Sequence, residues 1–249
     1  MYNGLMPITS YDIRICNSCG LRYPLVEGHP FGTRCPACMG ETRIALRVSR
    51  QLVTEPSPTP PLNLNTKDTK DTKEEEKLPN LRGLRGSKSF SVLLDNIRSA
   101  WNVGSILRSA DGFGFMHAYL CGITPTADNE TVTKTSLGAE DTVPWSYHKD
   151  AVKLIKGLKK EGWKVYALEE DERSISLESD TLASPWRHGD APALQILIIG
   201  NEVTGVDPEL LDLCDQIFYI PMRGEKKSFN VAIAFGIAAY ALSVRKLES

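Results

Sequence analysis

The chain has no apolar run approaching the roughly 18 residues that a membrane-spanning helix needs. Its first residues carry neither a basic segment nor a long apolar core typical of a secretory signal. We therefore expect a cytoplasmic protein with no membrane partner. The 4 histidines are scattered, and none has a serine or cysteine at a spacing that indicates a catalytic pair. We interpret them as core or surface residues.

Two common nucleotide-binding motifs are also missing. Gly112-x-Gly114 lacks the third glycine of a dinucleotide fingerprint and follows a predicted helix instead of opening one. The segment from Gly200 to Gly205 lacks the Lys-Ser/Thr pair of a phosphate-binding loop, and Glu202 would repel a phosphate there. The sequence therefore argues against a Rossmann-type dehydrogenase and a P-loop enzyme.

The chain carries little net charge, because 29 basic and 31 acidic residues give −2. The basic residues are unevenly distributed, however. Residues 1–50 contain arginines but no lysine, namely Arg14, Arg22, Arg34, Arg43, Arg47 and Arg50. Arginine forms planar, bidentate contacts with phosphates. The arginines therefore suggest an RNA-binding surface, and an ordinary solvated surface is the alternative.

Four of the 6 cysteines form two close pairs, Cys16-x-x-Cys19 and Cys35-x-x-Cys38. Two such pairs supply the four thiolates of a tetrahedral zinc site and leave no open position, so the predicted zinc is structural. Disulfides or a thiol redox site are the alternatives. Cys121 and Cys214 lie in apolar segments and are predicted to be core residues.

Three parts follow along the chain: a zinc ribbon at 11–50, a flexible Pro- and charge-rich linker at 51–80, and a large domain at 81–249. In the large domain, apolar runs predict strands at 89–94, 116–121, 163–168, 195–199 and 217–220. Helical spacing and end signals predict helices at 105–112, 149–161, 208–214 and 230–245. This alternation predicts an α/β fold with a buried parallel sheet, whose ligands bind at the carboxyl ends of the strands.

Three ordered motifs fall at such strand-to-helix corners. They are Asn102-Val103-Gly104 with Arg108-Ser109-Ala110 and Phe113-Gly114; Gly200-Asn201-Glu202 with Gly205; and Ile220-Pro221-Met222 with Ser228-Phe229-Asn230. A middle segment, Lys134 to Glu140 with Pro144-Trp145, accompanies them. With these motifs, about residues 88–245 resemble the SpoU (TrmH-type) family of RNA ribose 2′-O-methyltransferases, within the SPOUT superfamily. Phe229 stands where this family usually has Leu or Met, and Val203 where it often has Gly.

The resemblance implies a trefoil-knotted methyltransferase domain, bound S-adenosylmethionine, a homodimer, and tRNA or rRNA as substrate. It implies that the cofactor pocket is lined by Leu168, Gly200, Ile220, Ser228 and Phe229. It also implies catalytic roles for Arg108, Asn102, Glu202, Ser228 and Asn230. A guanidinium stays protonated, so we expect Arg108 to clamp a phosphate and stabilise the developing alkoxide instead of acting as a base.

The leading hypothesis is an S-adenosylmethionine-dependent RNA 2′-O-methyltransferase whose tethered zinc ribbon grips RNA. Tyr23 and Phe31 of the ribbon are candidate base-stacking residues, or they pack around the zinc. A second hypothesis is a non-catalytic RNA- or ribosome-binding protein that retains the fold. In a third, the ribbon docks a protein instead of RNA.

Overall fold

The computed structural model describes residues 8–26, 32–51, 90–178, 194–226 and 228–244. Apart from Gln51, which ends a strand, the predicted linker at 51–80 lies outside the described residues, as do Phe31, His29 and His188. The described residues form a small antiparallel sheet and a larger parallel sheet covered by helices.

The small sheet lies within the predicted zinc ribbon. Its strands are β1 (Ile8–Cys16), β2 (Arg22–Val26) and β3 (Thr42–Gln51), in the order β2-β1-β3, and both pairings are antiparallel. Cys16 ends β1, so the first cysteine pair lies in the turn between β1 and β2. Buried Leu21 and Tyr23 pack with Cys16 and Cys35 in a core that is very small, as expected for a module that depends on a metal.

The large sheet has seven strands in the order β6-β5-β4-β9-β7-β10-β8, and every pairing is parallel. Its strands are β4 (Phe90–Asp95), β5 (His117–Cys121), β6 (Trp145–His148), β7 (Lys164–Leu168), β8 (Ile175–Ser176), β9 (Gln195–Ile199) and β10 (Gln216–Tyr219). The predicted parallel α/β sheet is confirmed. The five predicted strands are present within two residues of their predicted ends, whereas β6 and β8 were not predicted.

The helices are α1 (Ala100–Gly112), α2 (Glu130–Ser136), α3 (Ala139–Thr142), α4 (Ala151–Lys160), α5 (Pro208–Leu213) and α6 (Val231–Val244). The prediction that the first helix begins at Ser105 is wrong by five residues. Ser99 caps the helix earlier, because its side chain accepts a hydrogen bond from the Asn102 N–H at 3.4 Å. Asn102 and Gly104, which suggest a loop by composition, are therefore helical. α2 and α3 are further helices that the pattern missed.

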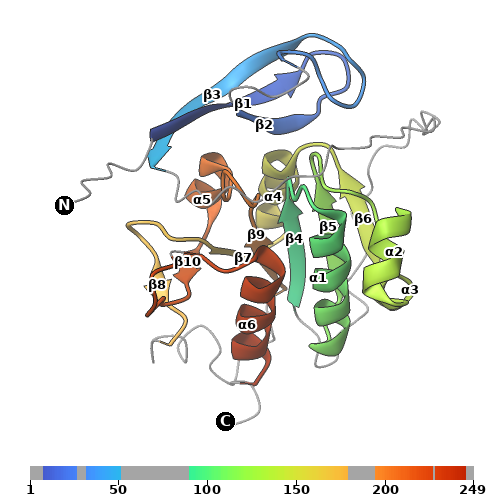
Figure 1. Cartoon of the computed structure of the whole chain (residues 1–249), viewed down its shortest axis with the longest axis vertical. Helices are drawn as coiled ribbons and strands as arrows, with labels where there is room; N and C mark the ends of the chain where they lie inside the picture. The colour runs from blue at the N-terminus through green and yellow to red at the C-terminus, as the bar shows by residue number, and fades with distance from the viewer. Residues whose placement is uncertain (1–7, 27–31, 52–89, 179–193, 227, 245–249) are drawn as a thin grey trace.

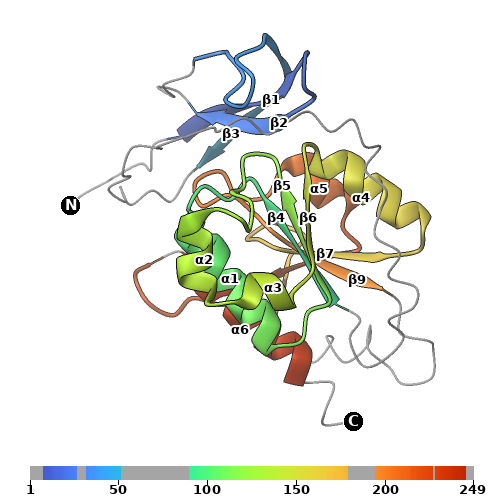
Figure 2. The same ribbon diagram turned by 90° about the vertical axis from the view of Figure 1, so that its right-hand side faces the viewer.

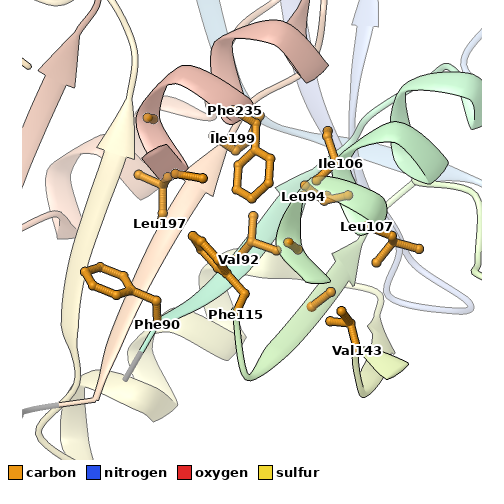
Figure 3. Packing of buried hydrophobic residues seen from close by; sticks show 14 of the residues in the cluster. Phe90, Val92, Leu94, Ile106, Leu107, Phe115, Val143, Leu197, Ile199 and Phe235 are labelled. Atoms are coloured by element: carbon orange, nitrogen blue, oxygen red, sulfur yellow. The ribbon is translucent and has the colours of Figure 1, made fainter. Parts of the chain in front are cut away.

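The strands bury alternate residues on opposite faces of the sheet. Val92 and Leu94 point toward α1 and α6, whereas Leu93 packs on the other face with residues of α4 and α5. Figures 1 and 2 show α1, α2, α3 and α6 over one face and α4 and α5 over the other. Figure 3 shows the first of these clusters, where Phe235 of α6 lies above Phe115. The two rings meet edge to face, with centroids 5.2 Å apart.

The ribbon sits above the end of the sheet at which the loops after β4, β5, β6 and β9 gather (Figure 1). The backbones of the ribbon and the large domain are in direct contact, since the Arg22 N–H of β2 donates to the Lys149 carbonyl after β6 at 2.9 Å. Across the described part of the chain, no helix combines the length and apolarity needed to cross a bilayer.

Candidate active site and zinc site

The Glu202 carboxylate joins the first two sequence motifs. It follows β9, and β4 lies beside β9 in the sheet, so the loops after both strands emerge at the same edge. Oε2 of Glu202 accepts the Arg98 N–H at 2.9 Å, and Oε1 accepts the Ser99 N–H at 3.1 Å. Oε1 also accepts from the Asn102 side-chain amide at 2.9 Å. The carboxylate therefore satisfies N–H groups where α1 begins, a position where negative charge is favourable.

A side-chain hydrogen bond adds the third motif to this site. The Asn230 amide donates to Oδ1 of Asn102 at 3.1 Å, across 128 residues of chain. Asn230 immediately precedes α6, and its own Oδ1 accepts the Ala232 N–H at 2.9 Å. Asn102 thus lies between Glu202 and Asn230. The structure brings these three predicted site residues together as one hydrogen-bonded row.

The loop that carries Glu202 is tightly folded. Asn201 and Gly205 exchange two backbone hydrogen bonds of 3.1 and 2.9 Å, and Gly205 has a φ of +70°. A Cβ on Gly200 would lie only 2.3 Å from the Gly205 carbonyl carbon, so the close approach requires glycine. The Asn201 side chain accepts the Val203 and Thr204 N–H groups and donates to the Asn96 carbonyl at 2.6 Å. Val203 therefore occupies a rigid loop even without the glycine that the family often has.

Arg108 is not part of this row. It follows Asn102 by six residues in α1, which is roughly 9 Å along the helix axis. Its side chain is exposed and forms no hydrogen bond or ion pair with any residue in the described part of the chain. Ser228 and Phe229 are also exposed, near the start of α6.

The predicted cofactor residues lie at the carboxyl ends of three adjacent strands. β7 lies between β9 and β10, and Leu168 is in register with both Ile199 and Phe218. Gly200 follows β9 and Ile220 follows β10, so Leu168, Gly200 and Ile220 share one edge. Leu168 and Ile220 are half-buried. Apolar side chains beside free strand ends fit an uncharged adenine and its backbone hydrogen bonds, so these residues fit S-adenosylmethionine.

A cavity of about 460 Å³ opens beside this edge. Ile220 and Pro221 line it together with Ile237 and Tyr240 of α6. Ile220 is one of the predicted cofactor residues, whereas Leu168 and Gly200 are not among the residues that line this cavity.

The four predicted zinc ligands are brought together. The Sγ atoms of Cys16, Cys19, Cys35 and Cys38 all lie within 4.8 Å of one another. Cys16 and Cys38 are 3.5 Å apart and Cys19 and Cys35 3.7 Å apart, close to the ~3.8 Å between thiolates expected at Zn–S distances of about 2.3 Å. Burial raises the pKa of Cys16, Cys19 and Cys35, but the Cys19 and Ser18 N–H groups that donate to the Cys16 sulfur lower the pKa of Cys16 to about 6. The donor set therefore fits a tetrahedral zinc ion.

The prediction that the ribbon's arginines form an RNA-binding surface is wrong for two of them. Arg14 and Arg22 are buried, and both are held by protein groups. Tyr23 is 1% exposed and donates to the Arg34 carbonyl, so it packs inside the ribbon instead of stacking on bases. Arg34 and Arg43 are exposed, and Arg47 is exposed while pairing with Asp12.

Two buried aspartates complete the site's support and were not predicted. The Asp95 carboxylate, at the end of β4, accepts the Asp207 N–H at 3.0 Å and the Asn96 amide at 2.8 Å. Burial raises the pKa of Asp95 to about 7, and the charge of Asp207 adds to the rise, whereas the Asp207 N–H, Asn96 and Arg22 oppose it. The sequence signals are different for the two residues: Asp95 directly follows an apolar segment, and Asp207 directly precedes Pro208 at the start of a helix.

The sequence model of the SpoU rRNA methylase family matches residues 89–240. The chain belongs to this family. Over 161 residues it is 30% identical to the tRNA (guanosine(18)-2′-O)-methyltransferase of Thermus thermophilus, which covers 64% of this chain and 76% of that protein. Over 151 residues it is 30% identical to the 23S rRNA (guanosine(2553)-2′-O)-methyltransferase of Bacillus subtilis, covering 61% of this chain and 56% of that protein.

The fold of the SpoU domain is likewise shared with solved structures. An S-adenosylmethionine-bound rRNA methyltransferase from Sinorhizobium meliloti superposes with a TM-score of 0.56 at 25% identity, over 63% of this chain and 56% of that one. The chain thus spans little more than half of the Bacillus and Sinorhizobium proteins. The predicted family, the SpoU-type fold and the RNA methyltransferase class are confirmed. The knotted path of the chain stays a prediction.

Proposed function

We propose that this SpoU protein transfers the methyl group of S-adenosylmethionine to a ribose 2′-hydroxyl of tRNA or rRNA. The observation that carries the proposal is the row Glu202–Asn102–Asn230, because it unites all three family motifs at one edge of the sheet. The names of the Thermus and Bacillus relatives support a tRNA or rRNA substrate and a 2′-O position.

The cofactor supplies a methyl group that its sulfonium makes electrophilic. Leu168, Gly200 and Ile220 would hold it at the ends of β7, β9 and β10, and Ser228 and Phe229 would hold it from the segment before α6. The remaining task is to orient a ribose hydroxyl in line with that methyl group and to ease loss of a weakly acidic proton. Asn102, Asn230 and Ser228 provide neutral hydrogen-bonding groups for the ribose, and Glu202 fixes Asn102.

Arg108 would clamp the phosphate next to the target ribose and stabilise the developing alkoxide, while the hydroxyl proton passes to that phosphate or to water. Its exposed position away from the row suits a site completed by a second copy of the chain. α6 supports such a homodimer, because its large hydrophobic side chains Ile233 and Tyr240 are 55% and 58% exposed and would be covered by a second copy. Phe229 and Ile237 extend the same exposed apolar surface.

The ribbon at 11–50 would bind one structural zinc ion through its four cysteines, and the exposed Arg34, Arg43 and Arg47 would contact RNA phosphates. The linker at 51–80 would connect it to the SpoU domain at 81–249. Reduced cysteines and an RNA substrate suit the cytoplasm.

Two measurements distinguish a methyltransferase from a non-catalytic RNA-binding protein: binding of the cofactor, and the effect of substituting Arg108 on turnover. Calorimetry should detect saturable binding of S-adenosylmethionine, whereas a pure RNA binder would show none. Arg108→Lys keeps the charge but loses the planar fork, so we expect turnover to fall by about 10²-fold or more. Arg173→Lys, at an exposed arginine paired with Asp212, is the matched control. Near-wild-type turnover in Arg108→Lys would show that the bidentate role is wrong.

A further inference from the structure

The zinc ribbon contacts the 200–207 loop, which carries Glu202, through a buried ion pair. Arg22, the first residue of β2, donates from Nε to Oδ2 of Asp207 at 2.7 Å and from an Nη atom to Oδ1 at 3.1 Å. The same guanidinium pairs with Glu209 at 3.1 Å. The side chains of Arg22 and Asp207 are only 4% and 3% exposed. This fork is shielded from water and cannot contact an RNA phosphate.

A second contact holds the same loop from β1. The Tyr11 hydroxyl is buried and donates to the Thr204 carbonyl at 3.2 Å. Thr204 lies two residues after Glu202, and Asp207 lies at the end of the loop. The ribbon therefore holds residues 204–207 at two points, directly after the glutamate that fixes Asn102 and the start of α1.

Backbone N–H groups of the held loop donate to two carboxylate side chains elsewhere in the site. The Asp207 N–H donates to Asp95 at the end of β4, and the Val206 N–H donates to Glu169 at the end of β7 at 2.9 Å. A shift of the loop would therefore disturb the ends of β4 and β7 together. β4 leads into the start of α1, and β7 carries the predicted cofactor residue Leu168.

The zinc knuckle presents Arg22 to this loop. The Cys16 N–H donates to the carbonyl of Leu21 at 2.9 Å, and Leu21 immediately precedes Arg22. The turn that brings Cys16 and Cys19 together thus also sets where β2 begins. Burying an ion pair is costly unless its geometry is good, so a module that served only to grip RNA would gain little from this fork.

We propose that Arg22 and Tyr11 are positioning residues, through which the zinc ribbon holds the 200–207 loop in the geometry that methyl transfer requires. The proposal rests on the proposed function, because it assigns Glu202 in this loop to the active site. The ribbon then supports catalysis from within the site's framework, in addition to any contact it makes with RNA.

The test compares full-length Arg22→Met, Tyr11→Phe and wild-type protein by amide hydrogen exchange and by methyl-transfer kinetics on tRNA and rRNA. Tyr11→Phe removes one hydroxyl and keeps the ring, so it reports on the contact even if Arg22→Met unfolds the ribbon. Lys159→Met is the matched control, because Lys159 pairs with Asp215 at 3.2 Å at the opposite edge of the sheet.

We expect amides 203–207 to exchange at least about tenfold faster in both ribbon variants, since these contacts limit local opening. kcat should fall by about ten- to a hundredfold in Arg22→Met, and less in Tyr11→Phe, because the loop that carries Glu202 would no longer be held in the geometry of the reaction. KM for RNA should stay within about threefold, because no phosphate contact is removed. The Lys159→Met control should match wild type in loop exchange.

Unchanged exchange of the loop in both variants would overturn the proposal, as would a rise in KM for RNA without a fall in kcat. If the wild-type protein transferred no methyl group, the proposed function would be refuted. Faster loop exchange in the variants of such a protein would still show that the ribbon holds the loop.

Discussion

Glu202→Gln perturbs the connection between the first two motifs while keeping the size of the side chain. The carboxylate accepts from the Arg98 and Ser99 N–H groups and from the Asn102 amide at distances of 2.9–3.1 Å. Glutamine keeps one acceptor oxygen and places an NH₂ group against at least one of these donors. The substitution therefore removes a hydrogen bond and a negative charge from the start of α1.

The expected magnitude follows from these contacts. A hydrogen bond to a charged group contributes about 1.5–3 kcal/mol, and a carboxylate at a helix N-terminus about 0.3–1 kcal/mol. Glu202 is exposed, so solvent screening reduces the sum, and we expect a loss of about 1–2 kcal/mol. For a chain of this size, that lowers the unfolding temperature by roughly 2–8 °C. Turnover should fall further, by about 10²-fold, because Asn102 loses its fixed orientation.

Thermal unfolding and single-turnover methyl transfer measure the two effects separately. Glu130→Gln is the control, since its carboxylate pairs with Lys134 on the exposed surface of α2 at 3.9 Å and should contribute little. If Glu202→Gln matched wild type in both assays, the row Glu202–Asn102–Asn230 would have no role. If only stability fell, Glu202 would be a structural support and not a site residue.

Three further predictions concern the metal, pH and assembly. Purified protein should contain about one zinc ion per chain by elemental analysis, and Cys38→Ser should lose it; a zinc-free wild type with oxidised cysteines would indicate disulfides instead. Because the pKa of Asp95 is raised to about 7, the protonated form is favoured in the folded state, so Asp95 contributes stability below pH ~4 that is lost as pH rises through 7. Asp95→Asn should therefore flatten the fall in unfolding temperature between pH 5 and 8, and an unchanged slope would show that Asp95 is ionised throughout. Ile237→Asp should convert a dimer into a monomer in light scattering and reduce turnover; an unchanged mass would place any dimer contact elsewhere.

The strands and the order of the motifs could be predicted because both depend on local sequence. β9 has the predicted bounds 195–199, since four apolar residues follow Gln195 and end at a glycine, a run too short for a helix. The carboxyl-edge rule then placed the loops after β4 and β9 near each other, and the structure adds the bond from Glu202 to Asn102.

α2 escaped prediction because its stability comes from packing and not from periodicity. Its sequence, ETVTKTS, is mostly polar and β-branched, and Asn129 caps it through the Thr131 N–H. Gly104 of α1 makes room for it, since a Cβ there would lie 2.5 Å from the Val132 carbonyl oxygen. A glycine that resembles part of a loop motif thus serves a contact between helices.

The ribbon contact could not be predicted from local patterns at all. Arg22 and Asp207 are 185 residues apart, and an arginine in a basic segment is as compatible with RNA contact as with a buried pair. Burial decides between the two, and burial depends on how the ribbon sits against the SpoU domain. For Tyr23 the sequence left base stacking and packing around the zinc both open, and the contacts within the ribbon decide for packing.

Mass spectrometry of RNA nucleosides tests the central claim most directly. Full-length protein, S-adenosylmethionine with a deuterated methyl group, and tRNA or rRNA lacking the modification should yield labelled 2′-O-methyl nucleosides, and Arg108→Lys should yield far fewer. Label found only on a base, or no label on either RNA with a protein that binds the cofactor, would contradict the account.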